Sequence, residues 1–199
     1  MRIVVIGASG TLGQAVVAEL GSRHEIVAVG RSSGDIRIDM TDQESIRAGF
    51  GQIGRFDALV ATTGKVKFAP LDQMDDAAYR IGLNDKLMGQ VNLVLMGMRT
   101  ISDGGSFTLT SGVLSHDPVR AGSSASMVNG AIDAFVMAAA IELPRGLRIN
   151  VVSPSLLEES LGAYGPFFPG HEPVPGARVA RAYAKSVEGG LSGKVIKVL

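Results

Sequence analysis

The sequence predicts one α/β domain built on a doubly wound parallel sheet. Short, β-branched apolar runs alternate with helical patterns along the whole chain, and a glycine-rich turn joins the first run to the first helical pattern. The length of 199 residues suits a single domain. Apolar runs without polar alternation are typical of strands that helices cover on both faces. We therefore expect a central sheet between two layers of helices.

The individual elements follow from periodicity, turn residues and caps. Thr41 or Asp42 is a suitable N-cap for a helix that carries Ile46 and Phe50. Residues 30–34 are too few for a crossover helix, so a bare loop should join the parallel strands on either side. Pro and Gly are frequent in residues 162–176, which we expect to form a long loop, often a lid or binding loop. Strands are expected at 3–6, 26–29, 35–38, 58–61, 106–110, 147–152 and 194–198, and helices at 11–20, from 41 or 42 through 50, within 72–101, at 123–143 and at 177–187.

Composition excludes several classes of function. The chain has no cysteine, so disulfides, thiolate metal sites and a cysteine nucleophile are ruled out. Lys and Arg together number 19, as do Asp and Glu, which disfavours nucleic acid as a partner. The apolar stretches 93–98 and 134–141 are shorter than the ~18 residues that a membrane span needs. We expect a cytoplasmic protein, without a metal site because the histidines and carboxylates lack ligand spacing.

The glycine-rich turn predicts a nucleotide site. Gly7, Gly10 and Gly13 follow the first strand and open the first helix. In this context the first glycine permits a tight turn, the second lets the backbone approach a pyrophosphate, and the third lets the helix pack on the strand. The free N–H groups of the helix then bind phosphates. The motif predicts a Rossmann-type dinucleotide-binding domain; a glycine-rich turn without ligand is the alternative.

Arg31 and Ser32 follow the second strand, where the adenosine ribose of a dinucleotide lies. An acidic residue there accepts a hydrogen bond from a 2′-hydroxyl, whereas arginine pairs with a 2′-phosphate. No Asp or Glu stands at this strand end, so NADP is favoured over NAD. A solvent-exposed surface arginine is the alternative.

Taken together, five segments resemble successive motifs of the short-chain dehydrogenase/reductase family. They are Gly7-Ala-Ser-Gly-Thr-Leu-Gly13, Asp39-Met-Thr-Asp42, Ala61-Thr-Thr-Gly64, Leu109-Thr-Ser111 and Arg148-Ile-Asn-Val-Val-Ser-Pro154. Each is loose alone, but their order and spacing match over essentially the whole chain. The resemblance implies hydride transfer between NADP and a small carbonyl or alcohol. It implies cofactor contacts from Gly7, Ser9, Gly10, Thr11, Leu12, Gly13, Arg31, Ser32, Asp39, Met40, Thr62, Thr63, Gly64, Pro154, Ser155 and Leu156.

The sequence departs from this family at the catalytic centre. Family members carry Tyr-x-x-x-Lys, in which the tyrosine gives a proton to the carbonyl and the lysine lowers the tyrosine pKa and holds the nicotinamide ribose. Here the alignment places Ala125 at the tyrosine and Asn129 at the lysine. None of Tyr79, Tyr164 and Tyr183 has a lysine four residues later. The usual acid is absent.

Other family positions are partly kept. Ser111 lies one residue from the expected place of the serine that hydrogen-bonds the substrate carbonyl. Asn84 is a candidate for the family's helical asparagine, but the spacing to Gly89 puts Lys86 there instead. Lys86 would supply the charge that Asn129 lacks, so the predicted catalytic set is Ser111, Lys86 and Asn129. A strand-end hydroxyl and a surface lysine are the alternatives, and water, His116 or Tyr164 remain open as proton donor.

Two functions therefore stay open at this point. One is an NADP-dependent oxidoreductase for a small carbonyl or alcohol, and the other is a catalytically degenerate NADP-binding sensor or regulatory protein. A purely structural module would leave the glycine turn unexplained. The resemblance also implies a homodimer or homotetramer, because in this family the helices corresponding to 84–101 and 123–143 pair between subunits.

Overall fold

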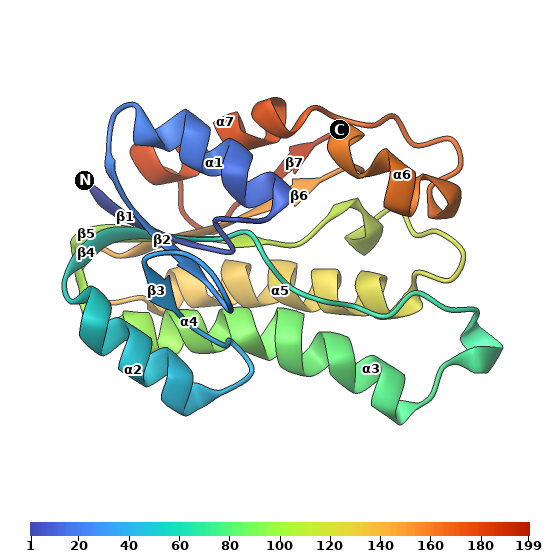
Figure 1. Ribbon diagram of the computed structural model, residues 1–199, viewed down its shortest axis with the longest axis horizontal. Coiled ribbons are helices and arrows are strands. Elements are labelled where there is room, and N and C mark those ends of the chain that lie inside the picture. Colours follow the sequence, from blue (N-terminus) through green and yellow to red (C-terminus); the bar gives the residue numbers. More distant parts are fainter.

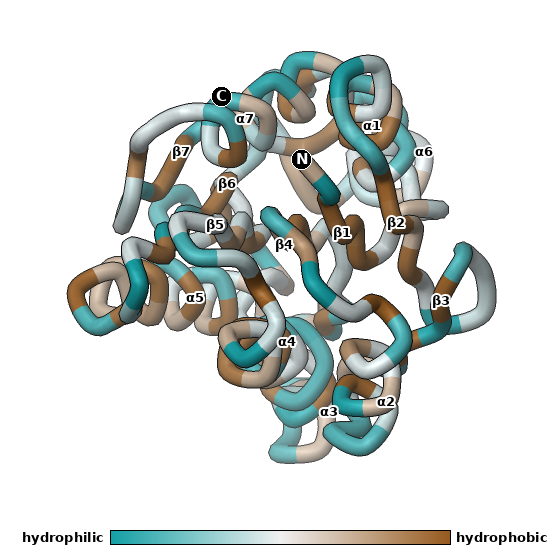
Figure 2. The backbone as a smooth tube through the Cα atoms, turned by 90° about the vertical axis from the view of Figure 1, so that its left-hand side faces the viewer, coloured by the Kyte–Doolittle hydropathy of each residue, from teal (hydrophilic) through white to brown (hydrophobic).

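The computed structural model describes residues 1–199 and places a seven-stranded parallel sheet between two layers of helices (Figure 1). The strand order is β3-β2-β1-β4-β5-β6-β7 (Figure 2). The first six strands thus have the order of the classical dinucleotide-binding fold. The strands are β1 (Arg2–Ile6), β2 (Glu25–Gly30), β3 (Ile36–Arg37), β4 (Phe56–Ala61), β5 (Ile101–Thr110), β6 (Arg148–Pro154) and β7 (Val195–Val198).

Helices cover both faces of the sheet, as the sequence predicts. α1 and α7 lie on one face, and α2, α4 and α5 lie on the other (Figure 1). Alternate residues of β1 enter different cores: Ile3 and Val5 pack with α1 and α7, whereas Val4 and Ile6 pack on the opposite side. The helices are α1 (Thr11–Gly21), α2 (Gln43–Ile53), α3 (Asp76–Gly82), α4 (Gly89–Gly97), α5 (Ser123–Glu142), α6 (Leu161–Tyr164) and α7 (Gly176–Glu188).

Several local predictions are confirmed and others are corrected. A bare loop joins β2 to β3, and Asp42 caps α2 by accepting a hydrogen bond from the Glu44 N–H at 2.9 Å. β5 begins at Ile101, five residues earlier than predicted. Residues 162–176 are not one plain loop, since they include part of α6 and the 3₁₀ turn η5 (Gly165–Phe167). Such short turns bury too few residues to give a periodic pattern.

The segment before α4 also differs from a simple helix. It consists of a 3₁₀ turn η1 (Leu71–Gln73), then α3, then a π-helical turn η2 (Leu83–Met88) that runs into α4. Single π-turns inside helices occur frequently at functional sites, because the extra residue turns a side chain toward a new direction. The π-turn contains Lys86.

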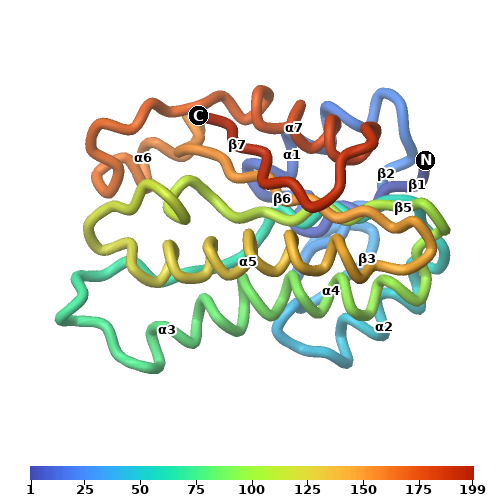
Figure 3. Tube along the Cα trace, turned by 180° about the vertical axis from the view of Figure 1, so that it is seen from behind, coloured from blue at the N-terminus to red at the C-terminus, as the bar shows by residue number.

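The helix α5 corrects the expectation about membrane-spanning stretches. Taken whole, its 20 residues are long and apolar enough to cross a membrane by length and composition. Core helices meet the same criterion, and Val128, Ile132 and Val136 of α5 are fully buried in the core beneath the sheet. Seen from behind, α5 runs beside α4 under the strands (Figure 3). Part of its hydrophobicity therefore serves the packing of this face, while Met137 and Ile141 stay exposed.

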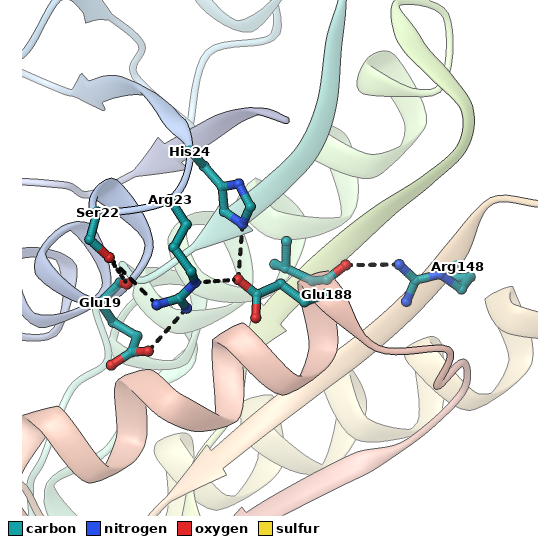
Figure 4. Close-up of polar contacts among 7 residues, drawn as sticks. Glu19, Ser22, Arg23, His24, Arg148 and Glu188 are labelled. Atoms are coloured by element: carbon teal, nitrogen blue, oxygen red, sulfur yellow. Dashed lines mark hydrogen bonds and ion pairs between the residues drawn. The ribbon is translucent and has the colours of Figure 1, made fainter.

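At the amino-terminal edge of the sheet, charged side chains tie α1 to α7 (Figure 4). One carboxylate oxygen of Glu188 accepts from Arg23 at 3.0 Å and lies 2.9 Å from Nε2 of His24. Arg23 also pairs with Glu19 at 3.1 Å. Arg148 donates to backbone carbonyls at the end of α7, where a helix leaves acceptors unpaired. These contacts fix α7 against the sheet, and the opposite edge is left for ligands.

Candidate active site and cofactor site

The turn after β1 is shaped for phosphate groups. Gly7 has φ +85° and donates its N–H to the Val29 carbonyl at 2.8 Å. A Cβ on Gly13 would lie 2.0 Å from the Gly7 carbonyl oxygen, so α1 can pack this closely only without a side chain there. No side chain caps the start of α1, and its first turn has no acidic residue. The free N–H groups of this helix are therefore available to an anion such as a diphosphate.

A first cavity of about 270 Å³ lies beside this turn, at the ends of β1 and β2. Arg31 at its rim pairs with Asp39, with 2.9 Å between Nη2 and Oδ2. Asp39 also accepts from the hydroxyl and the N–H of Thr41, and these bonds, helped by Arg31, lower the pKa of its carboxyl. The ionised Asp39 thus holds a 63% exposed Arg31 at the cavity. Lining residues are Ile6, Gly7, Gly30, Arg31, Ser32, Ile38, Asp39, Met40, Thr63, Lys65 and Asp85.

A second, larger cavity of about 420 Å³ lies further along the same edge, near the ends of β4, β5 and β6. Its inner end is polar and its outer wall is apolar and aromatic. The ring of Phe68 contacts those of Tyr164, Phe167 and Phe168, with centroids 5.1–6.4 Å apart. No acidic side chain lines it. The polar lining residues are Lys65, Lys86, Ser111, Asn129, Ser155, Ser160 and Tyr164, and the apolar side chains include Val66, Phe68, Ile81, Val113, Leu114, Leu156, Leu157 and Phe168.

Lys86, Ser111 and Asn129 meet at the polar end of this cavity. Nζ of Lys86 donates to Oδ1 of Asn129 at 2.7 Å and to the backbone carbonyl of Ser111 at 2.9 Å. Ser111 is 3% exposed, and its hydroxyl has no hydrogen-bond partner in the protein. Buried hydroxyls are normally paired, so the unpaired Ser111 hydroxyl marks a place in the cavity wall where a polar partner is missing. Ala125, for which the sequence predicts the family's tyrosine position, is buried in the cavity wall.

Gln90 and Gly64 explain why Lys86 points inward. Gln90, in the first turn of α4, is fully buried and exchanges two hydrogen bonds with the backbone of Thr110 at 2.8 and 2.9 Å. The same side chain donates to the Lys86 carbonyl at 3.1 Å, which satisfies an acceptor of the π-turn. Gly64 lets Lys86 pass, because a Cβ there would lie 2.4 Å from Cγ of Lys86. The π-turn is thus fixed to the end of β5, next to Ser111.

The environment of Lys86 changes its acidity. Burial lowers its pKa to about 8, and the charge of Asp133 opposes this shift only in part. A lysine with such a pKa is mostly protonated at neutral pH but releases its proton more readily than a surface lysine. The polar end of the cavity therefore combines one cation with one unpaired hydroxyl.

The structure gathers the predicted residues at one edge of the sheet. The Thr62 hydroxyl donates to the carbonyls of Ile6 and Gly7 and so holds the turn, and Thr62 lines neither cavity. Gly7, Arg31, Ser32, Asp39, Met40 and Thr63 line the first cavity, and Gly64, Lys86, Ser111, Asn129, Pro154, Ser155 and Leu156 line the second. Ser9, Gly10, Thr11, Leu12 and Gly13 form the turn and the start of α1.

The alternative catalytic candidates are placed less favourably. His116 is exposed, contacts the Ser115 hydroxyl at 3.2 Å and lines neither cavity. Asn84 is exposed and lies outside both cavities, whereas Lys86 lines the second one. Of the two candidates for the family's helical asparagine position, Lys86 is therefore the one that reaches the site. Tyr164 lines the second cavity but is 45% exposed. Tyr183 is fully buried against the Thr110 hydroxyl, and burial raises its pKa.

Sequence reasoning missed several contributors to the site. Lys65 lines both cavities, and its N–H donates to Asp85 at 2.7 Å. Its position directly after Gly64, at a strand end, is a signal that was present in the sequence. Gln90 and Phe68 gave no such signal, because a lone amide within an apolar helix and an aromatic residue in a loop each have many structural uses.

Comparison with known proteins agrees with this geometry. A family model described as enoyl-(acyl carrier protein) reductase matches residues 2–172. The chain belongs to the short-chain dehydrogenase/reductase family. An uncharacterized oxidoreductase of Methylorubrum extorquens is 29% identical over 157 residues, which cover 76% of this chain. The chain spans about three fifths (61%) of the length of that curated relative.

Solved structures extend the likeness to the whole chain. The protein lin1944 from Listeria innocua is 48% identical with a TM-score of 0.99, and the match covers 100% of both chains. A small-chain dehydrogenase solved in complex with NADPH is 26% identical with a TM-score of 0.88, covering 100% of this chain and 96% of that one. The predicted family and the predicted Rossmann-type fold are confirmed.

Proposed function

We propose that this protein is an NADP-dependent oxidoreductase that acts on a small carbonyl or alcohol. The observation that carries the proposal is the group formed by Lys86, Asn129 and the unpaired hydroxyl of Ser111, at the carboxyl edge of the sheet and further along it than the glycine turn. Ligands bind at this edge in open parallel sheets. The site thus keeps a cation and a hydroxyl where the family carries out its chemistry.

Support for NADP comes from the first cavity. Arg31, held by Asp39, presents a guanidinium at the position where a 2′-phosphate would lie. The NADPH complex of the 26% identical relative supports the same cofactor. The turn from Gly7 to Gly13 would hold the diphosphate, and Pro154, Ser155 and the Gly64 backbone would flank the nicotinamide, which supplies hydride when bound.

The catalytic residues exchange places relative to the family pattern. Lys86 stands at the family's asparagine position and Asn129 at its lysine position, and the two side chains touch at 2.7 Å. We infer that Ser111 donates a hydrogen bond to the substrate carbonyl, and that Lys86 stabilises the negative charge that develops on its oxygen. Asn129 orients the ammonium group of Lys86.

The second cavity indicates a small, apolar carbonyl compound as substrate. Beyond the polar end, the cavity wall is apolar and includes Phe68, Phe168 and Leu114. The only cations that line the cavity are Lys65 and Lys86. An aliphatic or aromatic ring suits this wall, whereas a cationic substrate would meet two lysines without a carboxylate.

The test has a binding arm and a turnover arm. Calorimetry should show NADPH binding, and a panel of apolar aldehydes and ketones should be reduced by the wild type. Restoring the family pattern requires Ala125→Tyr with Lys86→Asn and Asn129→Lys, because Asn129→Lys alone would place two ammonium groups together. Tight NADPH binding with no turnover by the wild type or by this variant would favour the cofactor-binding sensor.

We further propose that the protein assembles into a homodimer or homotetramer through α4 and α5. Leu95 of α4 and Met137 and Ile141 of α5 are large apolar side chains that are 49%, 51% and 87% exposed. They accompany an apolar groove that α4 and α5 form side by side, with Glu142 as its one charged lining residue. A two-helix apolar face of this kind can bury itself against a second copy.

Light scattering tests this assembly. The wild type should exceed the chain mass of 20.7 kDa at least twofold at micromolar concentration, and Ile141→Glu should dissociate it. Leu71→Glu is the control, because Leu71 is 71% exposed on η1, away from this face. A monomeric wild type would rule out the proposal.

A further inference from the structure

The site lacks the tyrosine acid of its family, yet a carbonyl reduction needs a proton. Tyr79 is bonded to the Ser123 hydroxyl, Tyr183 is buried behind Thr110, and Tyr164 stands at the outer aromatic wall, packed on Phe68. His116 lies outside both cavities. Among the groups at the inner polar end, Lys86 alone has a readily exchangeable acidic proton.

The hydrogen bonds of Lys86 leave one proton free. An ammonium group has three N–H donors, and two of them are used by Asn129 Oδ1 and the Ser111 carbonyl. The second bond places Nζ 2.9 Å from the backbone of the residue whose hydroxyl is unpaired. Lys86 and Ser111 both line the second cavity, so the third N–H is the donor that a bound carbonyl oxygen would meet at this end.

We propose that Lys86 is the general acid of this enzyme and takes over the role of the missing tyrosine. This inference rests on the proposed oxidoreductase function. In the reduction, the carbonyl carbon gains the hydride of NADPH, the C=O π bond opens, and its oxygen takes a proton from Nζ of Lys86. The products are the alcohol, NADP⁺ and a neutral amine, which regains a proton from water.

The surroundings favour this role over that of a fixed charge. Burial brings the pKa of Lys86 to about 8, close to working pH, where general acids are most effective. Ala125 leaves room in the cavity wall where the family's phenol would stand. The other titratable groups around Lys86 are Asp85 on its own turn, Lys65 after β4, Asp133 on α5 and Tyr164 on α6.

The pH dependence has a defined sign in each direction. Reduction requires the protonated amine, so its rate should fall as pH rises through about 8. Oxidation of the alcohol requires the neutral amine, so its rate should rise over the same interval. An independent reading comes from ¹³C-lysine NMR, in which the Cε signal of Lys86, assigned by its loss in Lys86→Arg, should titrate at the same pH with and without NADPH.

Two variants distinguish a general-acid role of Lys86 from a purely electrostatic role. Lys86→Arg keeps the positive charge but does not release a proton at any working pH, so it should retain NADPH binding and lose ~10²–10⁴-fold in kcat. Lys86→Ala should be rescued in part by small primary amines, with rates that depend on the amine pKa. Lys67→Ala is the matched control, because Lys67 is exposed and lines neither cavity.

The outcomes distinguish this inference from the function it rests on. A reduction rate that does not change across pH 8, with Lys86→Arg as active as the wild type, would overturn the acid role and leave the oxidoreductase intact. If Lys86→Arg fails to bind NADPH, the rescue of Lys86→Ala by amines becomes the test of the acid role. Absence of rescue then overturns the proposal. A wild type that binds NADPH but reduces no carbonyl would overturn both.

Discussion

The two halves of the ligand-binding edge are built in different ways. The half around Gly7 and Arg31 uses backbone shape, since a Cβ on Gly10 or Gly13 would lie against the Gly7 carbonyl oxygen. The half around Ser111 uses side chains: Lys86 and Asn129 touch at 2.7 Å, and we propose that they stand in each other's family positions while Ala125 takes the place of the acid. The glycines of the turn cannot be replaced without moving the backbone, whereas a positively charged side chain can reach the same place from either of two facing helices. A binding half can therefore stay recognisable while the catalytic half is rearranged.

The substitution Gly13→Ala should impair the cofactor-binding half most strongly. Its Cβ would lie 2.0 Å from the Gly7 carbonyl oxygen, so α1 must move away from the turn. We expect loss of measurable NADPH binding by calorimetry and an unfolding free energy lower by about 1–3 kcal/mol. Gly51→Ala in α2 is the matched control, since nothing lies within 4 Å of that Cβ. Normal NADPH binding by Gly13→Ala would show that the turn is not the phosphate site.

Arg31→Ala tests the cofactor preference of the same half. Hydrogen bonds to charged groups contribute about 1.5–3 kcal/mol, so the variant should lose roughly 10- to 100-fold in NADPH affinity while NADH affinity stays unchanged. Arg37→Ala, on the exposed side of β3 and outside the cavity, is the control. Equal wild-type affinities for NADPH and NADH would contradict the assignment of Arg31.

Gln90→Leu tests how firmly the catalytic half is held. Leucine fills similar space but leaves the buried N–H and carbonyl of Thr110 without their partner. We expect a loss of about 1–3 kcal/mol in the free energy of unfolding, measured by denaturant titration. Turnover should fall as well, because the π-turn that carries Lys86 loses its anchor. A variant as stable as the wild type would mean that the strand end is held by other contacts.

Glu188→Gln gives the smallest effect, far from both halves. Hydrogen bonds from His24 and Arg23 lower the Glu188 pKa, so its contribution to stability is present above the ordinary value of 4.5 and is lost as pH falls through the lowered folded value. The cluster is partly exposed, so the loss at neutral pH should stay below about 1 kcal/mol. Thermal melts at several pH values check this, with Glu158→Gln as a control at an exposed carboxylate. If wild type and Glu188→Gln still differed in stability by the same amount at acid pH, the pairing of Glu188 with Arg23 and His24 would be contradicted.

What the sequence could predict follows the same division. The doubly wound parallel sheet, the loop between β2 and β3, a cap at Thr41 or Asp42 and the position of the glycine turn all follow from local patterns. The inward direction of Lys86 does not, because it depends on a π-turn and on a hydrogen bond from Gln90 to a distant strand. Spacing alone left Asn84 and Lys86 as competing candidates, and only the folded chain separates them.

Transfer of isotopic hydrogen tests the central claim most directly. NADPH deuterated at C4 of the nicotinamide is mixed with the protein and an apolar ketone, and the alcohol is analysed by mass spectrometry under single-turnover conditions. If the rearranged catalytic centre is active, the wild type should place deuterium on the carbinol carbon. Lys86→Arg should then transfer deuteride at least ~10²-fold more slowly. Tight NADPH binding without deuterium in any alcohol of the panel would contradict the account and show that the chain binds its cofactor without transferring hydride.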